Sequence, residues 1–307
     1  MISLTRTSHR AARTPEPPTR ICGEADYREV PHESALGSIV NSSVAGHSQM
    51  PSGYEPAIQV VLPYFGLFAY SVGSERWLID PASVLLIKPG WEYRDEQPVE
   101  GLGHACLLLN PSETIVDEIL RGRSDAGVPA FGAAQSSPAL WLLSQSFLSE
   151  AISGLTTLQG DEWMIRVLAM AFDRPPINAR PSSSTIARAK EFLHAHPFEK
   201  LSLERVASAV GVSPVYLTQE FTRSEGVPLY QYQLGLRLAR ALHDLRDCED
   251  ITQLALELGF SSHSHFSAKF RQTFGLSPSQ VRGKVRHRRS EQGFVARQMK
   301  RAEQRSA

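Results

Sequence analysis

Two short segments in the last third of the chain combine polar and basic side chains with pairs of large apolar ones. Leu217 and Phe221 are four positions apart, as are Phe266 and Phe270, so each pair would lie on one side of a helix. The opposite side of the first segment carries Val215, Tyr216, Thr218, Gln219, Thr222 and Arg223. The opposite side of the second carries His263, Ser264, His265, Ala268, Lys269, Arg271 and Gln272. Amide, hydroxyl and guanidinium groups can bond base edges or phosphates, and small apolar groups can touch thymine methyls. These residues are therefore candidate contacts to duplex DNA.

The two segments belong to an internal repeat of residues 203–228 and 251–278. Val206, Ala207, Gly211 and Val212 match Leu254, Ala255, Gly259 and Phe260 at an offset of 48 residues. The offset then becomes 49, which pairs Leu217, Phe221 and Gly226 with Phe266, Phe270 and Gly275. A one-residue insertion in the turn explains this step.

Each copy of the repeat has the residue types that a helix-turn-helix needs. A small residue (Ala207 or Ala255) lets two helices cross closely, and glycine lets the chain reverse direction in a few residues. One such unit is also compatible with a helical hairpin in any α protein. Two units, joined by a helix over Pro228–Asp247, favour DNA binding, since successive major grooves lie about 34 Å apart.

The helices around the repeat can be placed from their end signals. We expect helices over Ile186–His196 and Leu203–Val210, the second capped by Ser202. A third should start at Pro214 and stop at Gly226, and a fourth should start at Ile251 after the cap Asp250.

These motifs resemble the AraC/XylS family of transcription regulators. ALELGFSSHSHFSAKFRQTFGLSPSQVR (residues 255–282) looks like the signature of that family, and LRLARAL (residues 236–242) resembles its linking helix. The resemblance covers about residues 184–282. It implies a bipartite all-helical DNA-binding domain whose two recognition helices read the major groove. The family commonly has arginine where this chain has Ala268, which lies next to Lys269.

The first half of the chain reads as strands followed by helices. Turn signals such as Asp80-Pro81 and Pro89-Gly90 separate the short apolar runs Ile58–Leu62, Leu67–Val72, Trp77–Ile79, Val84–Ile87 and Ala105–Leu109. This spacing predicts a small antiparallel β-barrel. Helical spacing then runs through residues 111–172, with stripes at Leu140, Leu143, Phe147 and Ala151 and at Trp163, Val167 and Ala171.

Residues 78–101, LIDPASVLLIKPGWEYRDEQPVEG, resemble the cupin-like sensor domain of the same family. Such domains commonly bind a small effector, dimerise, or do both. The predicted fold class is therefore α+β, with an N-terminal barrel plus helices and a C-terminal all-α domain with two helix-turn-helix units.

Charge is distributed unevenly along the 307 residues although the formal net charge is +0. Residues 1–183 contain 13 Lys and Arg against 20 Asp and Glu, and residues 184–307 contain 19 against 12. A basic half suggests contact with a polyanion, or alternatively a solvated basic tail. The predicted boundaries are a disordered N-terminus (1–20), a sensor and dimerisation domain (21–172), a linker (173–184), a DNA-binding domain (185–282) and a basic tail (283–307). We expect few contacts across the Pro- and Ser-rich linker. In the tail, Arg286, Arg288 and Arg289 could add phosphate contacts.

Other chemistry has weaker support in the residues. His9, His32, His47 and His104 show no cupin metal spacing, and His263 and His265 point in different directions on a helix. Cys22, Cys106 and Cys248 form neither a CxxC motif nor a Cys/His cluster, and Cys106 lies in an apolar run typical of a core. We therefore predict no catalytic residue, no metal site and no cofactor. The alternative is a DNA-targeted or barrel enzyme that uses the helical domain only for localisation.

The expected protein is a sequence-specific transcription factor, here taken as an activator, whose partner is double-stranded DNA. We also expect a homodimer, an unidentified small-molecule effector, and RNA polymerase as a candidate partner. The N-terminus lacks the apolar stretch of a secretory signal, and the apolar run Ala57–Val72 is too short and too interrupted for a membrane span. Together with the cysteine usage, this predicts a cytoplasmic location without membrane contact.

Overall fold

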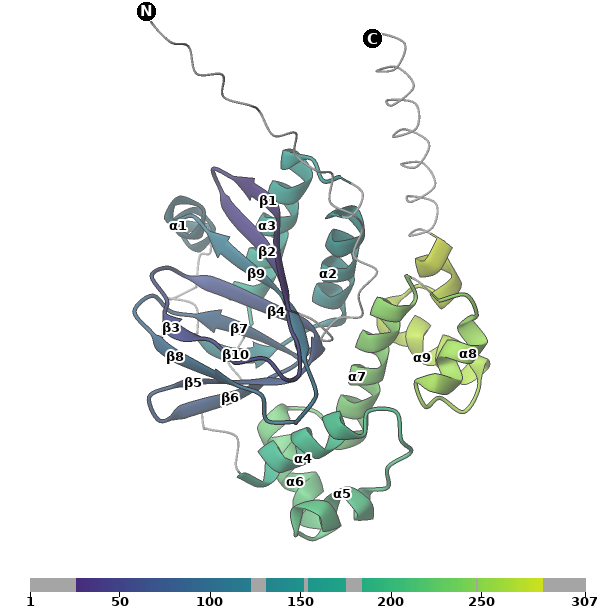
Figure 1. Ribbon diagram of the computed structural model, residues 1–307. Helices are drawn as coiled ribbons and strands as arrows, with labels where there is room; N and C mark the ends of the chain where they lie inside the picture. The colour runs from purple at the N-terminus through teal and green to yellow at the C-terminus, as the bar shows by residue number, and fades with distance from the viewer. Residues whose placement is uncertain (1–25, 123–130, 152–153, 175–183, 247, 284–307) are drawn as a thin grey trace, which may run out of the picture.

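The computed structural model describes residues 26–122, 131–151, 154–174, 184–246 and 248–283. Its N-terminal part has two antiparallel sheets (Figure 1). The six-stranded sheet has the order β1 (Tyr27–Ser34), β2 (Gly37–Val44), β9 (His104–Pro111), β4 (Gln59–Gly66), β7 (Ser83–Ile87) and β10 (Gly132–Gln135). The four-stranded sheet has the order β3 (Ser52–Tyr54), β8 (Glu92–Glu96), β5 (Phe68–Val72) and β6 (Glu75–Ile79). Closure of these sheets into a cupin-like barrel stays a prediction.

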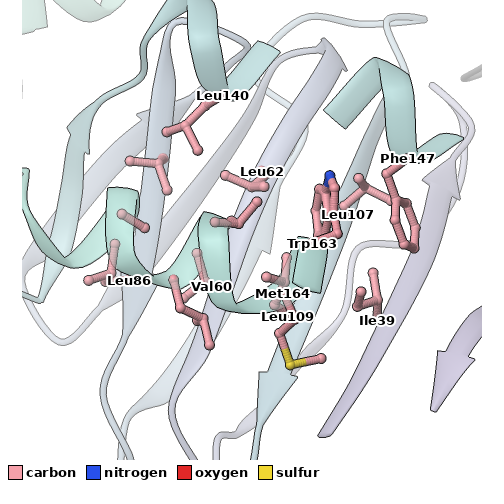
Figure 2. Packing of buried hydrophobic residues seen from close by; sticks show 14 of the residues in the cluster. Ile39, Val60, Leu62, Leu86, Leu107, Leu109, Leu140, Phe147, Trp163 and Met164 are labelled. Carbon is pink, nitrogen blue, oxygen red and sulfur yellow. The ribbon is translucent and has the colours of Figure 1, made fainter. Parts of the chain in front are cut away.

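The six-stranded sheet buries both of its faces, which explains the continuous apolar runs of its central strands. Successive side chains of a strand point to opposite faces. Val60 and Leu62 therefore face a core formed with helices α2 (Pro138–Ala151) and α3 (Thr157–Phe172), to which Phe147 and Trp163 contribute (Figure 2). Val61 faces a second core, shared with residues of the four-stranded sheet such as Tyr70.

The five predicted apolar strand runs coincide with β4, β5, β6, β7 and β9, and both helical stripes lie on α2 and α3. The strand region is longer than expected, since it extends from Tyr27 to Gln135. Strand β1 is mostly polar and lies at a sheet edge, so it lacks the apolar signal of the central strands. Residues 111–172 are not wholly helical: helix α1 (Glu113–Arg121) is followed by β10, whose four residues pair with β7.

The C-terminal part of the described chain is helical, as expected. Its elements are α4 (Ser184–Ala195), α5 (Leu203–Val210), α6 (Pro214–Glu225), α7 (Leu229–Asp244), α8 (Ile251–Glu257) and α9 (His263–Phe274). Helix α7 lies between a first unit (α4, α5, α6) and a second unit (α8, α9), and its flank faces the sheets (Figure 1). Pro228, expected inside α7, is its N-cap.

The N-terminal and helical parts pack closely, contrary to the expected scarcity of contacts between them. Helix α2 packs on both α7 and α9, and α7 packs on β4. The Arg240 guanidinium lies over the Phe65 ring at 4.7 Å. The sequence did not indicate these contacts, because the elements that pack against each other are far apart along the chain. Of the predicted linker, residues 175–183 lie outside the described residues, as do residues 1–25 and 284–307.

Candidate nucleic-acid interface

The first helix-turn-helix is formed by α5 and α6. Ser202 caps α5 by accepting a hydrogen bond from the Arg205 backbone nitrogen, as predicted. Gly211 then takes a left-handed conformation with φ of 73°. The chain reverses there, and the Val212 nitrogen donates back to the Ala207 carbonyl at 3.0 Å. Leu217 and Phe221 are fully buried against α4 and α7, which confirms their predicted role in fixing α6.

The second helix-turn-helix, α8 and α9, repeats the glycine conformation and the backbone hydrogen bond of the first turn. Gly259 has φ of 77°, and the Phe260 nitrogen donates to the Ala255 carbonyl at 3.0 Å. Phe266 and Phe270 are fully buried. Ser262 caps α9 as Ser213 caps α6, each accepting from the nitrogen three residues on. Because these caps are 49 residues apart while the turn glycines are 48 apart, the predicted insertion lies between them.

The predicted residues of α6 form its solvent face. Val215 and Tyr216 are 67% and 47% exposed, although both are large and apolar enough to be buried elsewhere. Thr218 and Thr222 donate to the carbonyls four residues earlier, so their methyl groups and hydroxyl oxygens remain available. Gln219 is exposed, and no side-chain hydrogen bond is seen for it among the described residues. Arg223 is exposed and pairs with Glu220, its Nε lying 3.0 Å from Glu220 Oε2.

The predicted residues of α9 divide into two groups. Ser264, Ala268, Arg271 and Gln272 are exposed. His263, His265 and Lys269 are half-buried. His265 Nδ1 lies 3.0 Å from Ser261 Oγ, and its ring meets Phe260 edge-on, so the opposite ring nitrogen is the one left for a ligand. Lys269 Nζ donates to Gln272 Oε1 at 3.3 Å.

Arg237 of α7 connects the two units, a role that sequence reasoning missed. Its guanidinium donates to three carbonyl oxygens: Pro197 at 3.2 Å and Glu199 at 2.6 Å, which precede α5, and Gly259 at 3.2 Å in the second turn. Burial lowers the pKa of Arg237 from its ordinary value, partly offset by the nearby Tyr230. The only signal in the sequence was an arginine inside the LRLARAL segment. Arg237 therefore links the segment before α5 to the turn between α8 and α9.

The metal and thiol chemistry weighed from the sequence can be compared with the described residues. Within them, no group of three or more His, Cys, Asp and Glu side chains could hold a metal ion. Cys106 is buried in the core between the sheets, as predicted, and burial raises the pKa of its thiol to about 12. The thiolate, which is the reactive form, is therefore disfavoured. Cys22 lies outside the described residues.

No helix within the described ranges combines the length and the apolar character needed to cross a membrane.

Comparison with known proteins places this geometry in a family. A family described as a helix-turn-helix domain matches residues 206–284. The transcriptional activator RhaS of Escherichia fergusonii is 35% identical over 92 residues, which are 30% of this chain and 33% of RhaS. The described repeat and these matches agree with the signature at residues 255–282. Over residues 206–284 the chain therefore belongs to this helix-turn-helix domain family.

One solved structure resembles the helical part alone, and one relative aligns with most of the chain. A structure of an AraC-type DNA-binding domain from Chromobacterium violaceum is 34% identical and covers 34% of this chain and 94% of that one, with a TM-score of 0.33. The uncharacterised regulator YdeC of Bacillus subtilis is 20% identical over 261 residues, which are 78% of this chain and 88% of YdeC. The alignment with RhaS spans about a third of the length of RhaS. The names of both relatives describe them as transcriptional regulators.

Proposed function

We propose that this protein, in keeping with its resemblance to AraC-type regulators, regulates transcription by placing α6 and α9 in successive major grooves of duplex DNA. The observation that carries the proposal is the repeated turn: two capped helices, each fixed from behind by a buried pair, present polar faces to solvent from one scaffold. Arg237 links the segment before α5 to the turn of the second unit, which suits a protein that must match two grooves about 34 Å apart.

The proposed contacts are the residues predicted from the sequence. On α6 they are Val215, Tyr216, Thr218, Gln219, Thr222 and Arg223. On α9 they are His263, Ser264, His265, Ala268, Lys269 and Arg271. Arg223 must open its pair with Glu220 to reach a phosphate, whereas Arg271 is exposed and forms no ion pair within the described residues. Arg271 is therefore the better probe of phosphate contact.

Salt dependence tests DNA binding directly. An operator is first selected from a randomised duplex library with the full chain, and its affinity is then measured across a salt series. Each phosphate contact contributes about −0.9 to the log–log slope, so Arg271→Ala should reduce the slope by about one for every sequence tested. Arg174→Ala, in the N-terminal part, is the matched control. A salt-independent affinity, or an unchanged slope in Arg271→Ala, contradicts the assignment.

We also propose that a small effector binds between the two sheets of the N-terminal part. The cross-strand registers place Trp77, Tyr70 and Asp95 side by side on strands β6, β5 and β8. The buried Tyr70 hydroxyl and one Asp95 oxygen have no hydrogen-bond partner among the described residues. Unpaired buried polar atoms are costly, and a ligand could satisfy them. The test is ligand-induced quenching of tryptophan fluorescence that Tyr70→Phe weakens.

Homodimer formation, barrel closure, contact with RNA polymerase and activation rather than repression remain predictions within this proposal. Sedimentation of the full chain with and without its operator tests the first of these.

A further inference from the structure

Asp80 lies in the turn between β6 and β7, fully buried beneath the first helix-turn-helix unit. One of its carboxylate oxygens belongs to the turn itself: Oδ1 accepts from the Ala82 nitrogen at 2.8 Å and from Ser83 Oγ at 3.3 Å. The other oxygen, Oδ2, accepts from Tyr232 of α7 and lies 3.1 Å from Lys190 Nζ of α4. A buried carboxylate of the N-terminal part thus contacts α4 and α7 of the helical part.

Lys190 carries this contact to the first recognition helix. Its side chain is 4% exposed, and its ammonium faces three acceptors: Asp80 Oδ2, Glu225 Oε2 at 3.1 Å, and the Leu78 carbonyl at 3.2 Å. Three acceptors match the three donors of an ammonium group. Glu225 is the last residue of α6. The chain of contacts therefore runs from the β6–β7 turn to the end of the first recognition helix.

Burial disfavours the charged forms of Asp80 and Lys190, whereas their pairing favours those forms. Burial alone would raise the pKa of Asp80, yet Lys190, His194 and Tyr232 together hold it below its ordinary value. Burial alone would lower the pKa of Lys190, yet the two carboxylates raise it. Both groups therefore stay charged, and removing one of them would leave the other as a buried charge without its partner.

The second recognition helix meets the same turn by a different route. The position equivalent to Glu225, 49 residues later, is Phe274, the last residue of α9. Its ring meets Trp141 of α2 edge-on, with centroids 6.1 Å apart. The Trp141 indole N–H donates to the carbonyl of Pro81, which directly follows Asp80. Both recognition helices thus end in contacts that lead to the Asp80-Pro81 turn.

We propose that Asp80 is a positioning residue for DNA recognition: through Lys190 and Glu225 it fixes α6 relative to α9, although it belongs to the N-terminal part. The inference rests on the proposed DNA binding by these two helices. Any displacement of the β6–β7 turn is then transmitted to the separation of the helices, so the turn couples the N-terminal part to operator choice.

Asp80→Asn is the informative substitution because it removes the charge while one side-chain oxygen can still close the turn. Glu225→Gln breaks the same contact from the other end, outside the N-terminal part. Asp161→Asn is the matched control, since Asp161 is a carboxylate paired with His32, Nε2 to Oδ1 2.9 Å, within the N-terminal part. All variants are assayed as full chains at a temperature at which their circular dichroism equals that of the unsubstituted chain.

The readout is the tolerance of binding to half-site spacing. The selected operator is remade with one or two base pairs added or removed between its half-sites, each base pair rotating one half-site by about 34°. The unsubstituted chain should bind one spacing best. Asp80→Asn and Glu225→Gln should lose about tenfold at that spacing and much less at the others, which flattens the profile, while Asp161→Asn keeps it.

The outcomes separate the inference from the proposed function. If the unsubstituted chain selects no sequence, the proposed function is wrong. If it does, but both variants keep its spacing profile, Asp80 does not position α6. An equal loss at every spacing shows only a loss of stability and also overturns the inference.

Discussion

Arg237 donates a hydrogen bond to the carbonyl oxygen of Gly259 while the same guanidinium donates to Pro197 and Glu199, so one side chain of α7 touches the approaches to both helix-turn-helix units. This bridge complements the Asp80-Pro81 turn, which is linked to the last residues of the two recognition helices through Lys190 and Trp141. Together they fix each unit at two points.

Replacing Arg237 by methionine should weaken DNA binding through loss of this bridge. Methionine keeps much of the packing volume but donates no hydrogen bond, and three carbonyls lose a donor. We expect operator affinity to fall by roughly tenfold or more, since each such bond contributes about 1 kcal/mol. Gel-shift titration measures it. Arg237→Lys, which retains one ammonium, should recover part of the affinity, and an affinity equal to that of the unsubstituted chain would contradict the bridge.

Gln219→Ala should relax specificity at one base pair and leave folding intact. The side chain is exposed on α6, opposite Leu217 and Phe221, and its amide can form two hydrogen bonds to adenine. Such a contact discriminates against the wrong base by about 1–3 kcal/mol. Titrations against all single-base operator variants locate the affected position. An equal loss for every variant would show that α6 contacts only the backbone.

Phe270→Ala should unfold the second unit without changing base preference in the fraction that remains folded. The ring is fully buried and packs against both Phe266 and Phe274, at centroid distances of 5.5 and 4.6 Å. Truncating a buried phenylalanine costs about 3–5 kcal/mol of unfolding free energy. Urea denaturation followed by circular dichroism is the measurement. Ala268→Ser, on the exposed face of α9, is the matched control and should change stability by less than about 0.5 kcal/mol.

Asp95 should make the protein less stable as the pH rises from neutral to about 8. Burial raises the pKa of Asp95 to about 8, and the Glu55 charge adds to the rise. The folded state therefore keeps a proton that the unfolded state has already released, and stability falls until the folded carboxyl ionises. The slope is at most about 1.4 kcal/mol per pH unit for one proton.

The pH series used for Asp95 must stay above the pH range in which His104 changes the stability of the protein in the opposite direction. Burial lowers the pKa of His104 from 6.5 to about 4, so between these values the unfolded state binds the extra proton and stability rises with pH. Chemical denaturation at pH 7 to 8, where His104 is mostly neutral in both the folded and the unfolded state, reports mainly on Asp95. Asp95→Asn should flatten the curve there, and a slope as steep as that of the unsubstituted chain would refute the shift.

The parts predicted best from the sequence are those in which local signals and packing agree. The repeat places Ala207 and Ala255 at helix crossings and glycine at both turns, and each of these residues has one conformational or steric role that few others could fill. The apolar runs of β4 and β7 were equally clear because both of their faces are buried. The polar edge strand β1, which pairs with the adjacent β2, and the four-residue β10, which pairs with the distant β7, gave no comparable signal, since neither is an apolar run of the length seen in the central strands.

The exposed face of α6 could also be predicted, because helical spacing fixes which residues lie opposite Leu217 and Phe221. The contacts between the two parts of the chain could not. Asp80 appeared in the sequence only as a turn residue next to proline, and Lys190 as a charge on a helix. They are 110 residues apart in the sequence, and their pairing depends on how the two folded parts pack against each other. The periodicity of apolar residues within one element does not predict such packing.

The tandem arrangement of unlike units gives the proposed binding site a direction. A symmetric pair of identical helices reads a palindrome and cannot tell one strand from the other. Here α6 presents Gln219 and Tyr216, whereas α9 presents Arg271 and His265, so one chain would read two different half-sites in a fixed order. Inverting such a site would turn the whole protein around on the duplex and aim its N-terminal part away from the promoter. Orientation, and not only position, would then decide which of two divergent genes responds.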